Sequence, residues 1–219
     1  MRLFADTGNL EQLRELKEMG VISGVTTNPT IASREGQSLS KTLSAICELF
    51  PDKPVFGQVV ETEKDKIIAQ ALKIGDIAQN IVVKIPATED GIKAIAALKA
   101  KNRRVCATTV LTSAQALMAA LAGADYVAPY VDKWDVSGYN GFQALEEIIA
   151  MFHAANLSSE VLAASIHRAQ DVVEVAKRGC DILTIDYSLI LSILRIPRPL
   201  VDGYVDNFLE DWHRAGCSV

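Results

Sequence analysis

The chain has 219 residues, of which 49% are hydrophobic and 22% charged, which is typical of a soluble globular domain with one large core. Its net charge of −5 and its isoelectric point near 5.3 exclude a general nucleic-acid-binding surface, because such a surface needs clustered positive charge.

The cysteines and histidines lack the spacing of a disulfide framework or a zinc site. The four cysteines form no CxxC pair, and the three histidines offer no paired ligands. We therefore expect reduced thiols and no metal or other cofactor. Asp6 stands where a signal peptide would need its apolar core, and no stretch approaches the ~18 apolar residues of a membrane span. The sequence predicts a cytoplasmic protein that does not bind membranes.

Short apolar runs rich in β-forming residues recur along the whole chain. They are Leu3–Ala5, Gly24–Thr27, Val55–Val60, Ile81–Ile85, Val105–Val110, Tyr126–Val131, Val161–Ala164 and Ile182–Ile185. Most are apolar on both faces, which is typical of strands in a buried parallel sheet.

Segments with apolar residues at helical spacing separate these runs. Examples are Leu10–Glu18, Lys64–Ile77, Gly91–Ala100, Ser113–Ala122 and Gly141–Ala154. Glycines stand where helices should end, since glycine readily adopts the left-handed conformation that closes a helix. These glycines are Gly20, Gly75, Gly123 and Gly179.

Eight strand–helix repeats within about 200 residues predict a compact (β/α)8 TIM barrel of the α/β class. A doubly wound open sheet is the alternative. The near-equal repeats and the lack of a Gly-rich dinucleotide turn weigh against it. We expect a single domain over residues 1–219, with the barrel at about 1–196.

An extra helix is predicted after the eighth repeat, at about residues 199–214. Leu200, Tyr204, Phe208 and Trp212 fall at four-residue intervals and form an apolar stripe that a barrel does not require. Such a stripe is too apolar to remain in water. We expect it to pack either on its own barrel or on a neighbouring subunit.

Polar side chains stand at the C-terminal ends of the predicted strands, where TIM barrels form their active sites. They are Asp6, Asn28, Gln58, Lys84, Thr108, Tyr130 and Ser165. Their convergence on one mouth predicts a functional site, although polar loops also begin at strand ends.

Lys84 is the sharpest signal, because it interrupts the apolar run Ile81–Pro86. Desolvation inside a barrel favours the neutral amine, which is a nucleophile toward carbonyl groups. The alternatives are a lysine that reaches out to water at the strand end and one that pairs with Asp6.

The other strand-end residues also have structural readings. Asp6 could cap the following helix, and Asn28 before Pro29 could serve only the turn. Gln58 and Tyr130 stand where an apolar residue would pack equally well. A glutamine in a barrel mouth needs hydrogen-bond partners, so we expect Gln58 to hold a water or a substrate hydroxyl.

Several segments, in the same order along the chain, resemble the small transaldolases and fructose-6-phosphate aldolases. The resemblance extends over essentially the whole chain and is carried by Asp6-Thr7, Gly24-Val25-Thr26-Thr27-Asn28-Pro29, Ile81-Val82-Val83-Lys84-Ile85-Pro86, Tyr126-Val127-Ala128-Pro129-Tyr130-Val131 and Ala163-Ala164-Ser165. It implies that Lys84 forms a Schiff base with a ketose. The iminium then accepts electrons while the C3–C4 bond breaks, which releases an aldehyde and leaves a three-carbon enamine.

The resemblance also implies a role for each site residue. Asp6 and Asn28 hold hydroxyls and orient the lysine, whereas Gln58, Thr108 and Tyr130 position a proton-relaying water. The implied catalytic residues are Lys84, Tyr130, Gln58, Asp6 and Thr108, and the implied substrate-binding residues are Asn28, Thr26, Ser165, Lys133 and Arg168.

Two positions separate the branches of this family. True transaldolases resemble one another in having Glu at the position of Gln58 and commonly Phe at that of Tyr130, whereas the aldolases have Gln and Tyr. The phosphate end departs from the family pattern. Lys133 replaces an arginine, and His167, with Arg168 beside it, replaces a basic residue. Lysine keeps the charge without the bidentate fork, so an unphosphorylated substrate is compatible with the sequence.

Three hypotheses follow. The first is a Schiff-base aldolase that joins or cleaves a dihydroxyacetone unit and an aldehyde, with a substrate like fructose 6-phosphate. The second is a transaldolase that passes this unit between sugar phosphates, and the third is a non-catalytic barrel. The expected partners are a sugar or sugar phosphate and, by resemblance, further copies of the chain in a decamer or pentamer.

Overall fold

The computed structural model describes residues 1–34, 36, 38–136 and 138–218. Within them, eight parallel strands pair in chain order and close into a barrel, with β8 against β1. The strands are β1 (Arg2–Asp6), β2 (Gly24–Thr26), β3 (Val55–Gln58), β4 (Ile81–Pro86), β5 (Val105–Val110), β6 (Tyr126–Pro129), β7 (Glu160–Ala163) and β8 (Ile182–Ile185). The predicted TIM barrel is confirmed.

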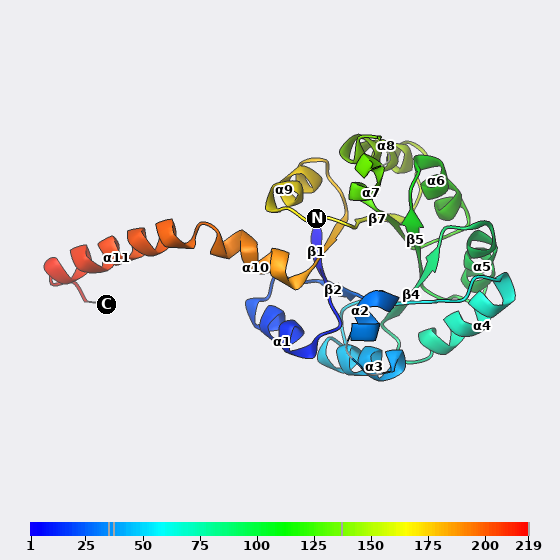
Figure 1. Ribbon diagram of the computed structural model, residues 1–219, viewed down its shortest axis with the longest axis horizontal. Coiled ribbons are helices and arrows are strands. Elements are labelled where there is room, and N and C mark those ends of the chain that lie inside the picture. The colour runs from blue at the N-terminus through cyan, green and yellow to red at the C-terminus, as the bar shows by residue number, and fades with distance from the viewer. Residues whose placement is uncertain (35, 37, 137, 219) are drawn as a thin grey trace.

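Helices surround the ring of strands (Figure 1). They are α1 (Leu10–Met19), α2 (Pro29–Arg34), α3 (Leu39–Leu49), α4 (Lys64–Gly75), α5 (Glu89–Lys99), α6 (Ser113–Leu121), α7 (Val131–Val136), α8 (Gly141–Ala154), α9 (Ala169–Lys177), α10 (Tyr187–Arg195) and α11 (Arg198–Arg214). The short helices α2 and α7 follow β2 and β6 directly, so they lie at the C-terminal end of the barrel, where the predicted site residues gather.

Even-numbered residues face the barrel interior on all eight strands. The inner cluster includes Phe4, Phe56, Val82, Cys106, Tyr126, Leu162 and Ile182, all at most 6% exposed. The Phe56 ring packs between the rings of Phe4 and Tyr126 in tilted and edge-to-face arrangements, with centroids 5.6 and 5.1 Å away. Gly24 leaves room for this floor, because a Cβ atom there would lie 2.8 Å from the Phe4 ring.

Side chains alternate between the two faces of a strand, so residues two positions after this apolar floor also face inward. Six of these eight positions are polar, namely Asp6, Thr26, Gln58, Lys84, Thr108 and Thr184, and the other two are Ala128 and Ala164. The fold therefore places one polar layer directly above an apolar plug, at the C-terminal mouth of the barrel.

Three of the four glycines named above follow helices in the left-handed conformation: Gly20, Gly123 and Gly179, with φ of 69°, 91° and 71°. Gly75 also stands at the end of a helix, as the last residue of α4, but it does not adopt the expected left-handed conformation. Asp76 closes the helix in the right-handed region and donates its N–H to carbonyls of the last turn.

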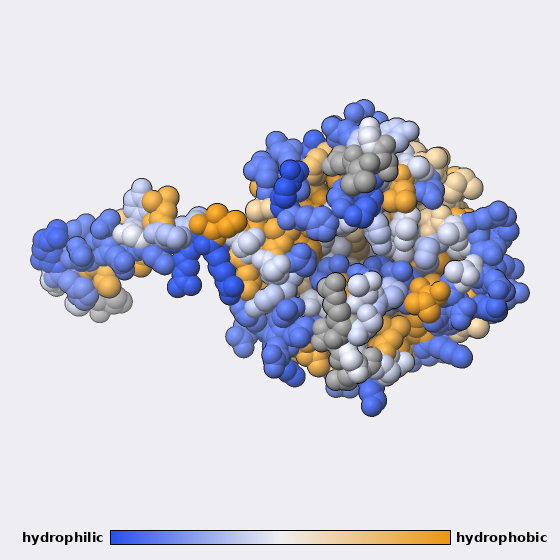
Figure 2. All heavy atoms as spheres, in the orientation of Figure 1, coloured by the Kyte–Doolittle hydropathy of each residue, from blue (hydrophilic) through white to orange (hydrophobic). Residues whose placement is uncertain are grey.

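The terminal helix α11 projects away from the barrel (Figure 1), and none of its residues is buried. Its apolar residues remain 44–67% exposed. Apolar side chains are visible on this projecting helix in Figure 2. The helix therefore does not pack on its own barrel, which was one of the two expected arrangements.

No helix among the described residues is both long enough and apolar enough to cross a lipid bilayer.

Candidate functional site

The polar layer at the mouth brings together six of the predicted site residues. Strand register places Asp6 beside Thr26 on β1 and β2, and Gln58 beside Lys84 on β3 and β4. Thr108 and Tyr130 approach each other from β5 and the end of β6, with hydroxyl oxygens 3.2 Å apart. The remaining predicted residues lie on the segments that follow β2, β6 and β7, with Lys133 on helix α7.

Lys84 is buried at the mouth, with 7% of its surface exposed. Its Nζ donates a hydrogen bond to the backbone carbonyl of Thr27 across the barrel, at 3.0 Å. The side chain therefore does not reach out to water. It forms no hydrogen bond or ion pair with Asp6 among the described residues, so the alternative of a direct pair is not seen. The Thr27 carbonyl therefore fixes the direction of the amine, and no described carboxylate is hydrogen-bonded to it.

Asp6 is held by a chain of hydroxyls. Its Oδ1 accepts a hydrogen bond from Thr26 Oγ1 at 2.6 Å, and the Thr26 and Thr184 hydroxyls lie 2.6 Å apart. Burial raises the pKa of Asp6, the Lys84 charge and the Thr26 hydrogen bond oppose this, and the charge of Asp186 adds to the rise. The expected alternative role does not apply, since the side chain of Asn9 caps α1. Asp6 is thus a carboxylate that can exchange a proton more readily than an exposed aspartate can.

Thr108 is fully buried beside a distortion of β5. The pairing of β5 with β6 shifts register between Ala107 and Val110, and Thr109 has a φ of 56°. A β-branched residue in the left-handed region is strained, and such strain clusters at functional sites. The distortion keeps Thr108 pointing inward toward Tyr130 while Thr109 faces solvent.

Gln58 has a buried Oε1 atom without a hydrogen-bond partner among the described residues. Buried acceptors are normally satisfied, so this atom calls for a donor. The observation agrees with the expectation that Gln58 holds a water or a hydroxyl.

Asn28 takes part in the turn after β2. Its Oδ1 accepts a hydrogen bond from the backbone N–H of Ile31 at 2.9 Å. The turn chemistry considered as an alternative is therefore present, and it occupies the side-chain oxygen of Asn28.

A second polar cluster lies at the rim, on the segments that follow β6 and β7. Asp132 Oδ2 is 2.7 Å from Lys133 Nζ and 3.3 Å from His167 Nε2. Burial acts to raise the pKa of Asp132, but Lys133, Ser165 and His167 outweigh it and hold that pKa below its ordinary value. Ser165 adopts a φ of 62° where the chain leaves β7. The cluster therefore contains a permanent negative charge beside its basic residues.

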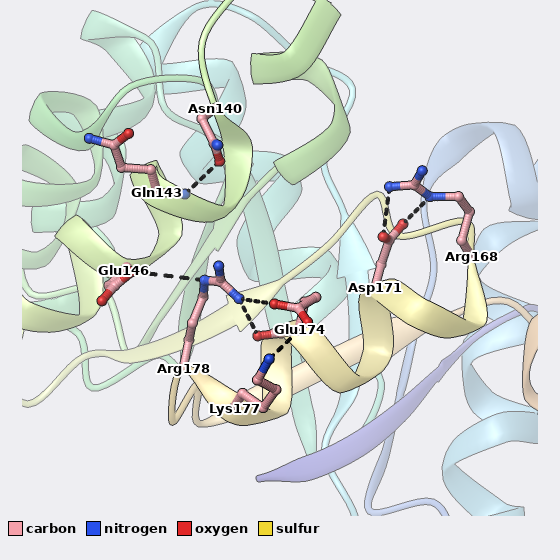
Figure 3. Close-up of polar contacts among 8 residues, drawn as sticks. All are labelled: Asn140, Gln143, Glu146, Arg168, Asp171, Glu174, Lys177 and Arg178. Carbon is pink, nitrogen blue, oxygen red and sulfur yellow. Dashed lines mark hydrogen bonds and ion pairs between the residues drawn. The ribbon is translucent and has the colours of Figure 1, made fainter.

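Arg168 pairs with the first turn of α9. Its Nε and Nη2 bind both carboxylate oxygens of Asp171, at 2.9 and 2.8 Å (Figure 3). Asp171 is buried, so this bidentate pair fixes the start of the helix. The role of Arg168 in substrate binding stays a prediction.

Sequence reasoning missed three residues of this region: Thr184, Asp186 and Asp132. Thr184 has the same inward position on β8 that Lys84 has on β4, which was the signal that could have found it. Asp186 follows the eighth strand as Asp6 ends the first, and its Oδ1 caps α10 by accepting from Leu189 N–H at 2.9 Å.

The buried thiol nearest to the mouth is inert. Cys106 pairs in register with Lys84, and burial raises its pKa to about 12, so it remains a neutral thiol. In the described part of the chain, no three His, Cys, Asp or Glu side chains gather closely enough to hold a metal ion. Lys84 contributes a buried amine to the mouth.

Two solved structures share the fold. A 3-hexulose-6-phosphate synthase superposes with a TM-score of 0.63 at 18% identity, covering 85% of this chain and 90% of its own. A thiamine phosphate pyrophosphorylase from Pyrococcus furiosus gives 0.60 at 20% identity, covering 90% and 96%. At these identities the likeness supports the fold alone.

Sequence relatives are more informative. The chain is 35% identical to a probable transaldolase of Thermoanaerobacter sp. (strain X514) and 36% identical to one of Clostridioides difficile (strain 630), in both cases over the full length of both chains. Residues 3–217 match the family described as transaldolase/fructose-6-phosphate aldolase. The chain belongs to the transaldolase/fructose-6-phosphate aldolase family.

Proposed function

We propose that the protein is a Schiff-base aldolase that cleaves, and in reverse forms, a C–C bond between a dihydroxyacetone unit and an aldehyde. The observation that carries this proposal is the buried Lys84 amine, aimed by the Thr27 carbonyl into a ring of polar side chains. An enzyme of this kind needs no added cofactor, because the lysine itself supplies the electron-accepting iminium.

The first step joins the Lys84 nitrogen to C2 of a ketose such as fructose 6-phosphate. Loss of one water from the resulting carbinolamine gives the iminium. Asp6, which Thr26 holds in place, orients the amine and accepts a hydrogen bond from a substrate hydroxyl, and Asn28 offers its side-chain N–H groups. Burial raises the pKa of Asp6, which favours proton exchange at this carboxylate.

The second step breaks the C3–C4 bond. The C4 hydroxyl gives its proton to a water held by Gln58, Thr108 and Tyr130, the aldehyde leaves, and the bonding electrons move into the enamine. The same water returns the proton to C3, and a second water hydrolyses the iminium to free dihydroxyacetone and the amine. The orphan acceptor of Gln58 and the Thr108–Tyr130 contact supply the polar groups for this relay.

Gln58 and Tyr130 favour release of dihydroxyacetone over its transfer. Tyrosine offers a proton that phenylalanine lacks, and glutamine binds water without ionising. Transfer to an acceptor aldehyde is the second candidate, because the relatives reported above are named probable transaldolases. Both candidates use the same Lys84 intermediate.

The remote end of the substrate would lie against Ser165 and Lys133 at the rim. Arg168 was expected to contribute there, but its guanidinium is paired with Asp171. We therefore assign the rim contacts to Ser165 and Lys133, with Thr26 and Asn28 at the opposite side of the mouth.

The test combines a trapping and a product experiment. The enzyme is incubated with dihydroxyacetone or fructose 6-phosphate, reduced with borohydride and mapped by mass spectrometry. We expect one three-carbon adduct, on Lys84. Release of free dihydroxyacetone is then measured with and without erythrose 4-phosphate. Release of dihydroxyacetone without acceptor supports the aldolase. Transfer to erythrose 4-phosphate that is faster than release supports the transaldolase. If no adduct forms, the non-catalytic barrel is supported.

A further inference from the structure

Asp132 brings a fixed negative charge to the rim of the mouth. It follows β6 on α7, and its carboxylate joins the segments after β6 and β7 through Lys133 and His167. Its side chain is only 27% exposed and contacts Lys133 and His167, which hold its charge at the rim. Any group that binds at this rim meets a carboxylate as well as the two basic side chains.

The charges at the rim do not form a phosphate site of ordinary strength. Lys133 and Asp132 cancel each other, and Arg168 is held by Asp171 in a bidentate pair. Asp186 and Asp6 add carboxylates on the far side of the mouth, after β8 and at the end of β1. A phosphate dianion would gain one lysine and lose much of that gain to the neighbouring carboxylate.

Asp132 already interacts with several groups of the protein. Lys133, Ser165 and His167 act on its carboxylate, and its Oδ1 atom, which has no hydrogen-bond partner by geometry among the described residues, is buried away from solvent. A substrate therefore meets the charge of Asp132 and not this oxygen atom. That charge repels a phosphate dianion and does not repel a neutral hydroxyl group.

We propose that Asp132 is a specificity-determining residue that selects substrates whose end remote from Lys84 carries a hydroxyl group instead of a phosphate. The proposal rests on the proposed function and names its substrate class, unphosphorylated hydroxyaldehydes and the ketoses formed from them. A terminal hydroxyl carries no charge, so the Asp132 carboxylate, which Lys133 and His167 hold in place, does not repel it.

The test keeps one donor and changes only the remote group. Dihydroxyacetone is added to D-glyceraldehyde or to D-glyceraldehyde 3-phosphate, and kcat/KM is measured for each. We expect the wild type to prefer D-glyceraldehyde. Asp132→Asn should shift the ratio of the two kcat/KM values toward the phosphate by about tenfold, which is the effect of one unit charge near a dianion in a well-solvated setting. The change should lie in KM, because the remote group does not react.

Asp65→Asn is the matched control, since Asp65 is an exposed carboxylate on α4 and should leave the ratio unchanged. Asp132→Ser also removes the charge and provides a second variant if Asp132→Asn does not fold. The wild-type ratio is informative by itself. A wild type that prefers the phosphate, or a ratio unaffected by both Asp132 variants, would overturn the proposal.

Adduct formation on Lys84 tests the proposed aldolase activity, whereas the ratio of the two kcat/KM values tests the role of Asp132. If Lys84 forms no adduct with dihydroxyacetone, the aldolase itself is wrong. If the adduct forms in the wild type and in both Asp132 variants while the phosphate is preferred, only the specificity assignment is wrong. Adduct formation needs no remote group, so the two measurements are independent.

Discussion

The barrel mouth and the terminal helix α11 depart from the usual distribution of side chains in opposite ways. In the mouth, polar groups such as Lys84 and Thr108 are buried. On α11, large apolar groups such as Phe208 and Trp212 are exposed. A buried amine and an exposed apolar stripe are both unfavourable in an isolated chain. Each therefore indicates a partner, a small polar molecule for the mouth and an apolar surface for the helix.

The two regions also differ in rigidity. The mouth residues lie on strands of a closed barrel and are held by a hydroxyl chain and by strained backbone at Thr109 and Ser165. The helix makes no buried contact of its own. Fixed geometry suits catalysis, because reacting groups must be held within fractions of an ångström. A projecting helix suits association, where position is set by the partner.

Replacement of Lys84 should have the largest effect. Lys84→Met fills the same volume without an amine, so we expect a folded protein that forms no borohydride-stable adduct and has no measurable cleavage. Lys66→Met, at an exposed lysine on α4, is the matched control and should retain both. Adduct formation on another lysine of the Lys84→Met protein would remove the mechanism as assigned, and mass mapping detects it.

Replacement of Tyr130 should have the second-largest effect, on the release of dihydroxyacetone relative to its transfer. Tyr130→Phe removes the hydroxyl that contacts Thr108, and with it an acid for protonation of the enamine. Release of dihydroxyacetone without acceptor should fall by ~10²-fold, the range of general acid–base catalysis. Transfer to erythrose 4-phosphate should suffer less. Equal losses of release and transfer would show that Tyr130 only packs the mouth.

Removal of the terminal helix should change the assembly of the protein and leave its chemistry unchanged. We expect the exposed stripe of Leu200, Tyr204, Phe208 and Trp212 to pack on a second copy of the chain in an oligomer. A chain that ends at Pro199 should then have a lower mass in analytical ultracentrifugation and keep its Lys84 adduct. Asp202→Asn on the polar side of α11 is the control for the mass. An unchanged mass of the shortened chain would contradict this role.

The fold was predictable because its signals are local and repeat eight times. Apolar runs marked the strands, and their C-terminal ends pointed to Lys84 and Asp6. Gly75 ends a helix without the expected left-handed conformation, because a glycine at a helix end need not adopt positive φ when the next residue closes the helix. The start of α11 was marked by Pro197-Arg198-Pro199, and its structure agrees with the predicted range to within one residue at the start.

Parts of the site could not be predicted, because they depend on contacts between distant segments. Thr184 meets Thr26 across 158 residues, and no local pattern records that pairing. Asp132 became informative only when the structure placed His167 beside it. The sequence indicated the charge of Arg168 but not its bidentate pair with Asp171, which only the structure shows.

Replacement of Asp6 should have the smallest effect, on stability. Because the pKa of Asp6 is raised in the folded state above its ordinary value of 3.8, the folded protein binds more protons than the unfolded chain in the pH range between the two values. Its stability therefore falls as pH rises through that range. Asp6→Asn removes this dependence, so the variant should melt at a higher temperature than the wild type at pH 7. The difference should shrink as the pH is lowered toward 4.

Differential scanning fluorimetry between pH 4 and 8 measures the difference in melting temperature, with the exposed Asp65→Asn as control. A variant that melts below the wild type at pH 7 would show instead that the charge of Asp6, balanced by Lys84 and Thr26, stabilises the barrel.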